Sequence, residues 1–183
     1  MPESLILASR SPQRRAILEQ LGVDFRVAAP DVEELTEGEP RRLVVQNARR
    51  KAAAVAGARV LGVDTAVVLD GRAFGKPREP AEAETFLRRL SGRTHEVMSG
   101  VALRDERGDR SDVAVTRVRF RLLEPDDINW YLASGEWRER AGGYAIQGQG
   151  AALVEAIDGD YFNVVGLPVA ALLRLDPDLL RRS

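Results

Sequence analysis

The order of apolar segments along the chain constrains its fold more than any other feature of the sequence. Residues 5–8 form a short apolar run that fits a buried strand. Directly after it, Ser11 suits a helix N-cap and Pro12 suits the first helical position. A second extended run at 24–29 and a strongly helical segment at 40–56 repeat the pattern. Such an alternation of strands and helices predicts an α/β fold.

Two hairpins are predicted in the middle of the chain. Residues 95–103 and 111–122 alternate apolar and polar side chains and are joined by a polar turn at 104–110. This pattern is typical of paired strands with one exposed face. Asp70 and Gly71 favour a second, tighter hairpin turn.

The end of the chain is predicted to add a strand over residues 151–157 and a helix over residues 169–180. The 183 residues are enough for one domain with a sizeable core and too few for two independent domains. We therefore expect a single α/β domain over residues 1–183, built on a mixed, strongly twisted sheet with flanking helices and forming two lobes with a cleft.

Composition excludes several classes of function. The 27 lysines and arginines balance 28 acidic residues, and the net charge of −1 argues against a nucleic-acid partner. The chain has no cysteine and one histidine, His95, which excludes disulfides, thiolate nucleophiles and multi-histidine metal sites. His95 opens a strand, and we expect it to be structural. Since no run of about 18 apolar residues is present, we expect a cytoplasmic protein without a membrane partner.

Lysine is rare in this chain. Only two of the 27 basic residues are lysines, Lys51 and Lys76. If most lysines have drifted to arginine, the survivors mark positions that need a compact ammonium, such as a tight phosphate pocket, where a planar guanidinium does not fit. Chance survival is the alternative interpretation.

The segment from Ser9 to Arg15 is a candidate phosphate site. It lies where a strand ends and a helix begins, and there the free backbone N–H groups and the helix dipole favour a bound anion. The serine hydroxyls and arginines of this segment would donate further hydrogen bonds to the bound anion. An ordinary capped helix with surface arginines is the alternative.

Asp64 is the candidate catalytic carboxylate. Apolar residues flank it at 61–63 and 66–69, and a carboxylate in such surroundings needs a partner or a chemical role. Capping of its own hairpin turn is the alternative. Glu33 and Glu34 lie on a polar loop, where acidic side chains are usually only solvated.

A covalent nucleophile is not evident in the sequence. The only histidine is far from Ser9 and Ser11 in sequence, and no nucleophile-elbow motif surrounds either serine. The candidate residues that remain are carboxylates, lysines and arginines. They suit metal-assisted attack of water on a phosphoanhydride. Carboxylates would hold Mg²⁺ or Mn²⁺ and orient the water, and cations would neutralise phosphate oxygens.

Several stretches of the sequence resemble the Maf-like nucleoside triphosphate pyrophosphatases, which are relatives in fold of the inosine triphosphate pyrophosphatases. They run in order from Leu7 to Pro168 and read LASRSPQRRAILEQLGV, DVEE, NARRKA, GVDTAVVLDG, GKPREPAEA, LSGRTHEVMSGVAL, ERAGGYAIQGQGA and NVVGLP. The resemblance implies hydrolysis of a nucleoside triphosphate between its α and β phosphates, with a divalent cation, to a monophosphate and pyrophosphate. It also implies a homodimer.

The resemblance assigns roles to matching residues. Asp64 of GVDT would accept the proton of the attacking water, and Glu33 of DVEE would hold the metal together with Asp64. The phosphates would be contacted by Ser9, Arg14, Lys51 and Lys76.

Three positions bear on the nucleotide base. Thr65, and Gln147 in the glycine-rich loop, resemble the branch of the family that acts on dTTP and UTP rather than the branch that acts on 7-methyl-GTP. An amide such as that of Gln147 can both donate to and accept from a pyrimidine edge. Gln13 departs from this branch, which usually has arginine there, and the change removes a cation near the substrate.

The sequence thus predicts a pyrophosphatase acting on dTTP and UTP. Two alternatives stay open: 7-methyl-GTP-type or broader specificity, and a regulator of cell division that binds a nucleotide without chemistry. The presence of Asp64 and Glu33 with Lys51 and Lys76 favours catalysis, because a pure binder has little need of carboxylates beside a polyphosphate.

Overall fold

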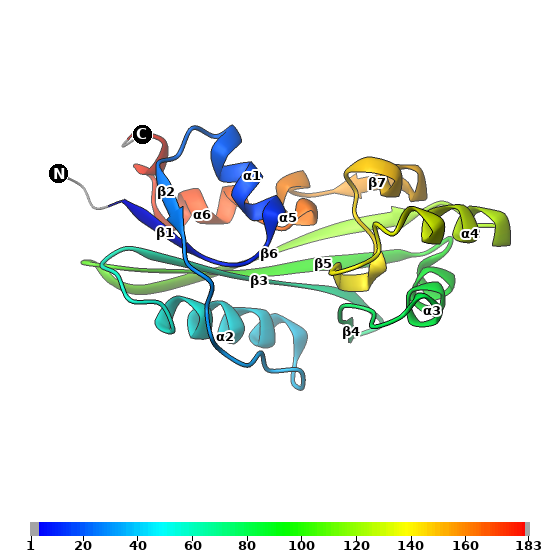
Figure 1. Cartoon of the computed structure of the whole chain (residues 1–183), viewed down its shortest axis with the longest axis horizontal. Helices are drawn as coiled ribbons and strands as arrows, with labels where there is room; N and C mark the ends of the chain where they lie inside the picture. The colour runs from blue at the N-terminus through cyan, green and yellow to red at the C-terminus, as the bar shows by residue number, and fades with distance from the viewer. Residues whose placement is uncertain (1–3, 182–183) are drawn as a thin grey trace. The chain divides into compact units, whose positions relative to one another are not determined.

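The computed structural model describes residues 4–181, which form strands and helices in alternating order (Figure 1). The strands are β1 (Leu5–Ala8), β2 (Phe25–Val27), β3 (Val60–Leu69), β4 (Arg72–Phe74), β5 (Thr94–Asp105), β6 (Gly108–Phe120) and β7 (Val154–Asp158). The α-helices are α1 (Pro12–Gln20), α2 (Pro40–Ala53), α3 (Pro80–Leu90), α4 (Pro125–Ser134), α5 (Tyr161–Val165) and α6 (Val169–Leu175). Short 3₁₀ helices are η1 (Ala141–Gly143), η2 (Gly148–Leu153) and η3 (Leu179–Arg181).

The strands form a mixed sheet in the order β2-β1-β3-β5-β6-β7, with β4 paired to β3. β1 pairs in parallel with both β2 and β3, whereas β4 on β3 and β7 on β6 are antiparallel. The predicted mixed sheet with flanking helices is therefore confirmed. The predicted strong twist and the cleft stay predictions.

The chain divides into two compact units. Unit 1 comprises Met1–Thr65, Ser99–Ala114 and Gly166–Ser183, and unit 2 comprises Ala66–Met98 and Val115–Val165. Strands β3, β5 and β6 contribute residues to both units. The two units are described separately below.

In unit 1, helix α2 packs directly on the strands. Figure 1 shows α2 on one side of β1 and β3, with α1 and α6 on the other side. A Cβ atom built on Gly62 of β3 would lie 2.0 Å from the carbonyl oxygen of Ala48, and one on Gly100 of β5 would lie 2.2 Å from that of Val44. Any side chain at either glycine would push the helix away, so these glycines allow the close approach of α2.

Apolar side chains of α2 and the strands fill the layer between them, with Ile6 and Ala8 of β1 facing Ala48 and Ala52 of α2. Helix α1 begins as predicted, with Ser11 at the N-cap and Pro12 in the first turn. Its buried residues are Arg14, Ile17 and Leu18.

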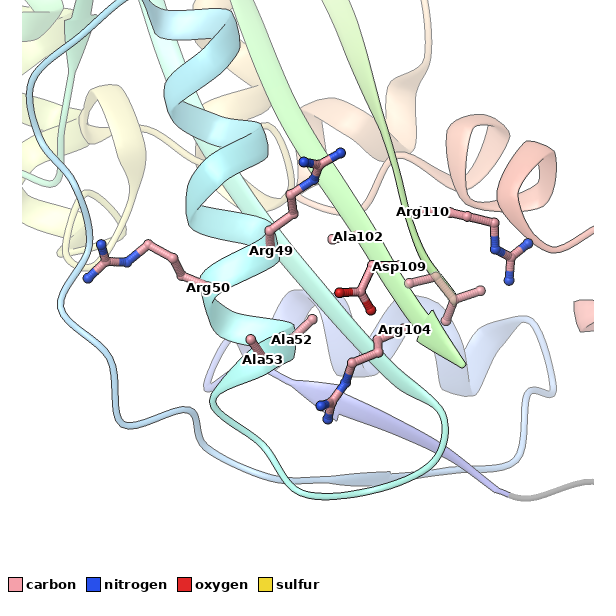
Figure 2. Close-up of a pocket in the computed structure, with 9 residues that line it drawn as sticks. Arg49, Arg50, Ala52, Ala53, Ala102, Arg104, Asp109 and Arg110 are labelled. Carbon is pink, nitrogen blue, oxygen red and sulfur yellow. The ribbon is translucent and has the colours of Figure 1, made fainter. Parts of the chain in front are cut away.

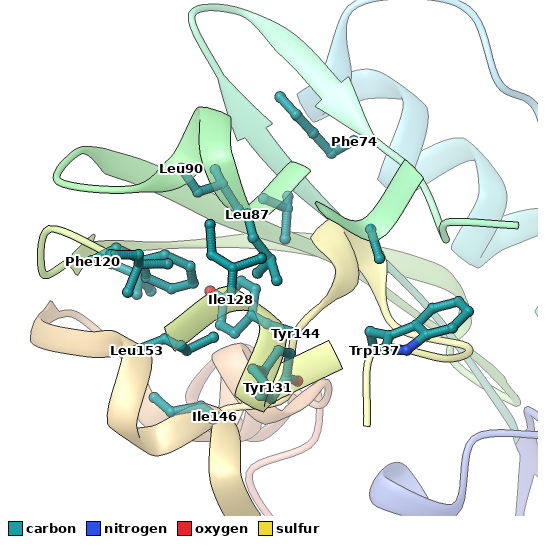
Figure 3. Close-up of a cluster of buried hydrophobic side chains, with 14 of the residues drawn as sticks. Phe74, Leu87, Leu90, Phe120, Ile128, Tyr131, Trp137, Tyr144, Ile146 and Leu153 are labelled. Carbon is teal, nitrogen blue, oxygen red and sulfur yellow. The ribbon is translucent and has the colours of Figure 1, made fainter. Parts of the chain in front are cut away.

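Unit 2 has its own core, formed by side chains from α3, α4, the strands and the glycine-rich loop (Figure 3). The ring of Phe120 packs edge-on against Tyr144 at a centroid distance of 4.8 Å. The predicted tight turn at Asp70 and Gly71 is confirmed, because both residues have positive φ values of 51° and 74° and join the antiparallel strands β3 and β4.

His95 lies in this core and is 2% exposed. Its Nε2 shares a hydrogen bond of 2.7 Å with the Tyr144 hydroxyl, and its ring packs edge-on against Phe120. Burial lowers the pKa of His95 from 6.5 to about 4, because a dry environment disfavours the imidazolium.

This burial makes the stability of the protein depend on pH. Between its unfolded pKa of 6.5 and its folded pKa of about 4, His95 binds a proton only in the unfolded chain. The free energy of unfolding should fall by up to about 3 kcal/mol from this group as the pH drops from 6.5 towards 4. His95→Gln should lose this part of the slope in urea unfolding at pH 7 and pH 4.5. An unchanged slope in the variant would assign the pH dependence to other groups.

Three predicted elements differ from the structure. The strand predicted at 151–157 begins only at Val154, because residues 148–153 form η2. The helix predicted at 169–180 ends at Leu175, where Asp176 precedes Pro177 and leaves the helical region at φ −135° and ψ 83°. The polar turn predicted at 104–110 is shorter, because β5 and β6 extend into it. Over the described range 4–181, no helix has the length and apolar character needed to cross a membrane.

Candidate functional site

The alternation of side chains along β3 sends Asp64 and Thr65 to opposite faces. Gly62 faces α2, since its missing Cβ would touch Ala48. Asp64, two residues further along the strand, therefore faces α2 as well. Thr65 faces the other side, where it contacts Arg14 of α1.

Asp64 is held by two side chains of α2. The Lys51 ammonium lies 2.8 Å from Asp64 Oδ1, and the Asn47 amide donates to Oδ2 at 3.0 Å. Asn47 and Lys51 are one helical turn apart and so share one face of α2. The Asp64 side chain is only 11% exposed. Capping of its own hairpin turn is therefore not its role, because both carboxylate oxygens are bound to α2.

Lys51 lies between two carboxylates. Its Nζ atom lies 2.7 Å from Glu34 Oε1, 2.8 Å from Asp64 Oδ1 and 3.4 Å from the Val63 carbonyl oxygen. Its side chain is 8% exposed. Three acceptors around one ammonium match its three N–H donors, an arrangement that a planar guanidinium cannot reproduce. The structure thus gives a physical reason for lysine at position 51.

The acidic loop before α2 is fixed by the same amide that binds Asp64. Asn47 accepts a hydrogen bond from the Leu35 N–H at 2.8 Å and donates to the Leu35 carbonyl at 3.0 Å. This double contact holds the loop against α2 and brings Glu34 to Lys51. Glu33, the predicted metal ligand, is exposed on the same loop.

The carboxylates fit a small divalent cation in part. Asp64 and Glu34 converge on one ammonium, and carboxylate oxygens are the donors that Mg²⁺ and Mn²⁺ prefer. Nowhere in the described part of the chain do three or more His, Cys, Asp or Glu side chains gather as a metal cage. The set therefore fits an ion that is bound through one or two carboxylates and completed by substrate phosphates.

Arg14 organises the other face of β3. It is buried and donates from Nε to the Gly166 carbonyl at 2.8 Å, from one terminal nitrogen to Ser9 Oγ at 3.0 Å and from the other to Thr65 Oγ1 at 3.1 Å. Burial lowers the pKa of Arg14, and the negative charges of Asp64 and Glu34 oppose that shift. Three of its five N–H donors are used, so two remain for a ligand.

Ser9 and Thr65 both support this arginine. The Ser9 hydroxyl oxygen also accepts from the Ser11 N–H at 3.1 Å, and the Thr65 hydroxyl lies 2.8 Å from the Ser99 hydroxyl. The Ser11 hydroxyl is turned towards Gln13, to which it donates at 3.1 Å. The predicted residues of unit 1 thus form two clusters on opposite faces of β3. Lys51 and Asp64 lie on the side of α2, and Ser9, Gln13, Arg14 and Thr65 lie on the side of α1.

Lys76 and Gln147 belong to unit 2. Lys76 follows β4 and forms an exposed ion pair of 3.4 Å with Glu139, in which the two side chains are 57% and 86% exposed. Such a pair contributes little to stability, so the ammonium is available to a ligand. Gln147 is exposed at the start of η2.

A hollow of about 300 Å³ elsewhere in unit 1 is lined by α2, β5 and β6. Four arginines surround it, but Figure 2 shows their guanidinium groups pointing in different directions. Three of these arginines are engaged by the protein, since Arg49 donates to Ser111, Arg104 to the Val55 carbonyl and Arg110 to Asp105. This hollow is therefore not an anion cradle.

Sequence reasoning missed three residues of the site: Asn47, Glu34 and Ser99. The spacing of Asn47 and Lys51 by one helical turn is a signal that could have identified Asn47. Glu34 and Ser99 could not be distinguished from their neighbours, because their contacts depend on the loop conformation and on the pairing of β5.

The chain is similar to several known proteins. The profile of the family described as Maf-like protein matches residues 4–176. A dTTP/UTP pyrophosphatase of Symbiobacterium thermophilum is 51% identical over 175 residues, covering 91% of this chain and 89% of that protein. One of Thermus thermophilus is 49% identical over 174 residues, covering 93% and 92%. A solved structure of the Staphylococcus aureus Ham1 protein matches with a TM-score of 0.47 and 16% identity over 64% of this chain and 72% of that one.

Proposed function

The chain belongs to the Maf-like family, and from that premise we propose that it hydrolyses dTTP and UTP to the nucleoside monophosphate and pyrophosphate. The observation that carries the proposal is the buried pair of Asp64 and Lys51, with the half-exposed Glu34 as the second carboxylate on the same ammonium. Relatives named dTTP/UTP pyrophosphatase at 51% and 49% identity support the choice of substrates.

Asp64 is the proton acceptor in this proposal. Each of its carboxylate oxygens accepts one hydrogen bond, from Lys51 and from Asn47, and each keeps a further lone pair for a water molecule. The two donors fix the carboxylate in place before substrate binds, so a bound water would be held in one orientation. Such preorganisation of base and nucleophile is how a general base accelerates hydrolysis.

Cations on both faces of β3 bind the polyphosphate. Lys51 exchanges a carboxylate partner for a phosphate oxygen, and the two free N–H groups of Arg14 reach a second one. Ser9 and the start of α1 add a hydroxyl and backbone N–H groups, which favour an anion. The resemblance also assigns Lys76 to the phosphates, and for this residue of unit 2 the role stays a prediction.

Asp64, with Glu33 or the neighbouring Glu34, would hold Mg²⁺ or Mn²⁺. The metal would neutralise charge on the triphosphate and polarise the phosphorus that is attacked. The homodimer and the cytoplasmic location implied above remain predictions.

Base selection is assigned to Gln147, whose amide would pair with the pyrimidine edge. Thr65, which the resemblance assigns to the same role, bonds to Arg14 and Ser99, and its part in specificity stays a prediction. Gln13 bonds to Ser11 at the start of α1, where the dTTP/UTP branch has a cation.

A nucleotide panel tests the proposed function. We expect dTTP and UTP to be turned over at least about tenfold faster than 7-methyl-GTP, ATP or GTP, because relatives at 51% and 49% identity are named for these two substrates and the Gln147 amide can pair with a pyrimidine edge. The products should be monophosphate and pyrophosphate, measured by chromatography, and a chelator should stop the reaction.

Other outcomes distinguish the alternatives. Preference for 7-methyl-GTP would overturn the branch assignment. Release of orthophosphate would contradict cleavage between the α and β phosphates. Tight nucleotide binding without turnover in Mg²⁺ and Mn²⁺ would favour the regulator of cell division.

A further inference from the structure

The glycine-rich loop that carries Gln147 is wrapped around one carboxylate, that of Glu136. Glu136 Oε1 accepts from the Gln149 N–H at 3.0 Å, and Oε2 accepts from the Gly150 N–H at 3.1 Å. These are the first N–H groups of η2, whose N-cap is Gln147. The carboxylate therefore satisfies donors at the helix start that no residue of the helix can satisfy.

Glu136 is itself held firmly by the end of α4. Helix α4 ends at Gly135, which has a φ of 73°. The Glu136 N–H donates to Ser134 Oγ at 3.1 Å. The next residue, Trp137, is buried, and its indole N–H donates to the Leu132 carbonyl at 3.2 Å. These contacts hold the backbone from which the Glu136 side chain extends.

The loop has a second attachment to α4 on the other side of Gln147. The Ala145 N–H donates to the Tyr131 hydroxyl oxygen at 2.9 Å. Burial raises the pKa of Tyr131 to about 12, so this phenol is neutral at all ordinary pH values. The side chain of Ile146 is buried in the core of unit 2. Gln147 lies between these two anchors and is exposed.

Close packing restricts the residue next to Gln147 as well. Gly148 has a φ of 69°, and a Cβ atom there would lie 2.5 Å from Glu136 Oε1. The positive φ favours glycine at this position, and a side chain there would also crowd the carboxylate.

We propose that Glu136 is a positioning residue for base selection: its carboxylate holds the backbone beside Gln147 so that the amide meets the nucleotide base in one orientation. This inference rests on the proposed function, because it uses the assignment of Gln147 to the base. Glu136 does not touch the substrate; it acts through the two backbone hydrogen bonds. Its loss should therefore lower the rate for dTTP more than the rate for ATP, and so change the ratio between them.

The test is Glu136→Gln, which keeps the shape but places an NH₂ group against a backbone N–H. We expect the ratio of kcat/KM for dTTP to that for ATP to fall by about tenfold. Glu136→Asp keeps the charge and both acceptor oxygens on a shorter side chain. Its ratio of kcat/KM values should lie between those of Glu136→Gln and the wild type. Glu155→Gln is the matched control, since Glu155 of β7 forms an exposed ion pair with Arg119 of β6 and the change removes the same charge. This variant should keep the wild-type ratio.

A double-mutant cycle separates positioning from general structural support. Gln147→Ala should lower the ratio by itself, and adding Glu136→Gln should then change it no further. Hydrogen exchange gives a readout without activity, in which the amides of Gln149 and Gly150 should exchange faster in Glu136→Gln than in the wild type.

The outcomes distinguish the inference from the proposed function. A wild-type protein that releases no pyrophosphate from any nucleotide overturns the proposed function and this inference with it. Wild-type selectivity in an active Glu136→Gln variant overturns this inference alone, as does an additional loss of selectivity on top of Gln147→Ala.

Discussion

Asp64→Asn is expected to lower kcat for dTTP by about 10²- to 10⁴-fold, the range by which general bases accelerate proton transfer. The amide keeps the size of the side chain and can still accept from one donor of α2, but it cannot take a proton from water. Steady-state rates of pyrophosphate release measure the effect.

Asp70→Asn is a matched control for this variant. Asp70 lies six residues further along the chain, at the exposed hairpin turn, where it pairs with Arg93. Asparagine tolerates its positive φ of 51°, so this variant should keep wild-type rates. Turnover retained in Asp64→Asn, with Asp70→Asn as the reference, would exclude Asp64 as the proton acceptor.

Lys51→Met is expected to lower the free energy of unfolding by about 3–5 kcal/mol, because it leaves the buried carboxylate of Asp64 without its cation. Urea unfolding at neutral pH measures this loss. Adding Asp64→Asn to Lys51→Met should restore much of the stability, since no buried charge is then left uncompensated.

Lys51→Arg tests the need for a compact ammonium while keeping the charge. The three acceptors around Nζ do not match the planar guanidinium, so we expect at least about a tenfold loss of kcat/KM for dTTP. Lys76→Arg, in an exposed ion pair, should be milder. Unchanged kinetics in Lys51→Arg would make the rarity of lysine uninformative.

Local patterns were enough to predict the main elements of the fold. Ser11 and Pro12 identify the start of α1, and Asp70 with Gly71 identifies the β3–β4 turn, because these residues act on the backbone around them. Asp64 could also be predicted as a special residue, since an acidic side chain within a buried strand is rarely without a partner.

The remaining features depend on contacts between distant parts of the chain. η2 replaces the first residues of a predicted strand because Glu136, 13 and 14 residues away in sequence, accepts the N–H groups of Gln149 and Gly150. Likewise, Glu34 rather than Glu33 meets Lys51 because Asn47 binds Leu35 on both its backbone groups. Periodicity carries no information about such contacts, because the acidic loop has no repeating pattern.

The spacing between α2 and the strands on which it packs has a consequence for mutations that inactivate the protein. The chain leaves out side chains at Gly62 and Gly100, which lets α2 lie close enough for the short amide of Asn47 to reach Asp64. An added methyl group at either glycine moves α2 away from the strands, and the Asn47 amide and the Lys51 ammonium move with it. If variants at these two glycines are inactive, the cause is the wider spacing between α2 and the strands. Their loss of activity does not show that either glycine contacts the nucleotide.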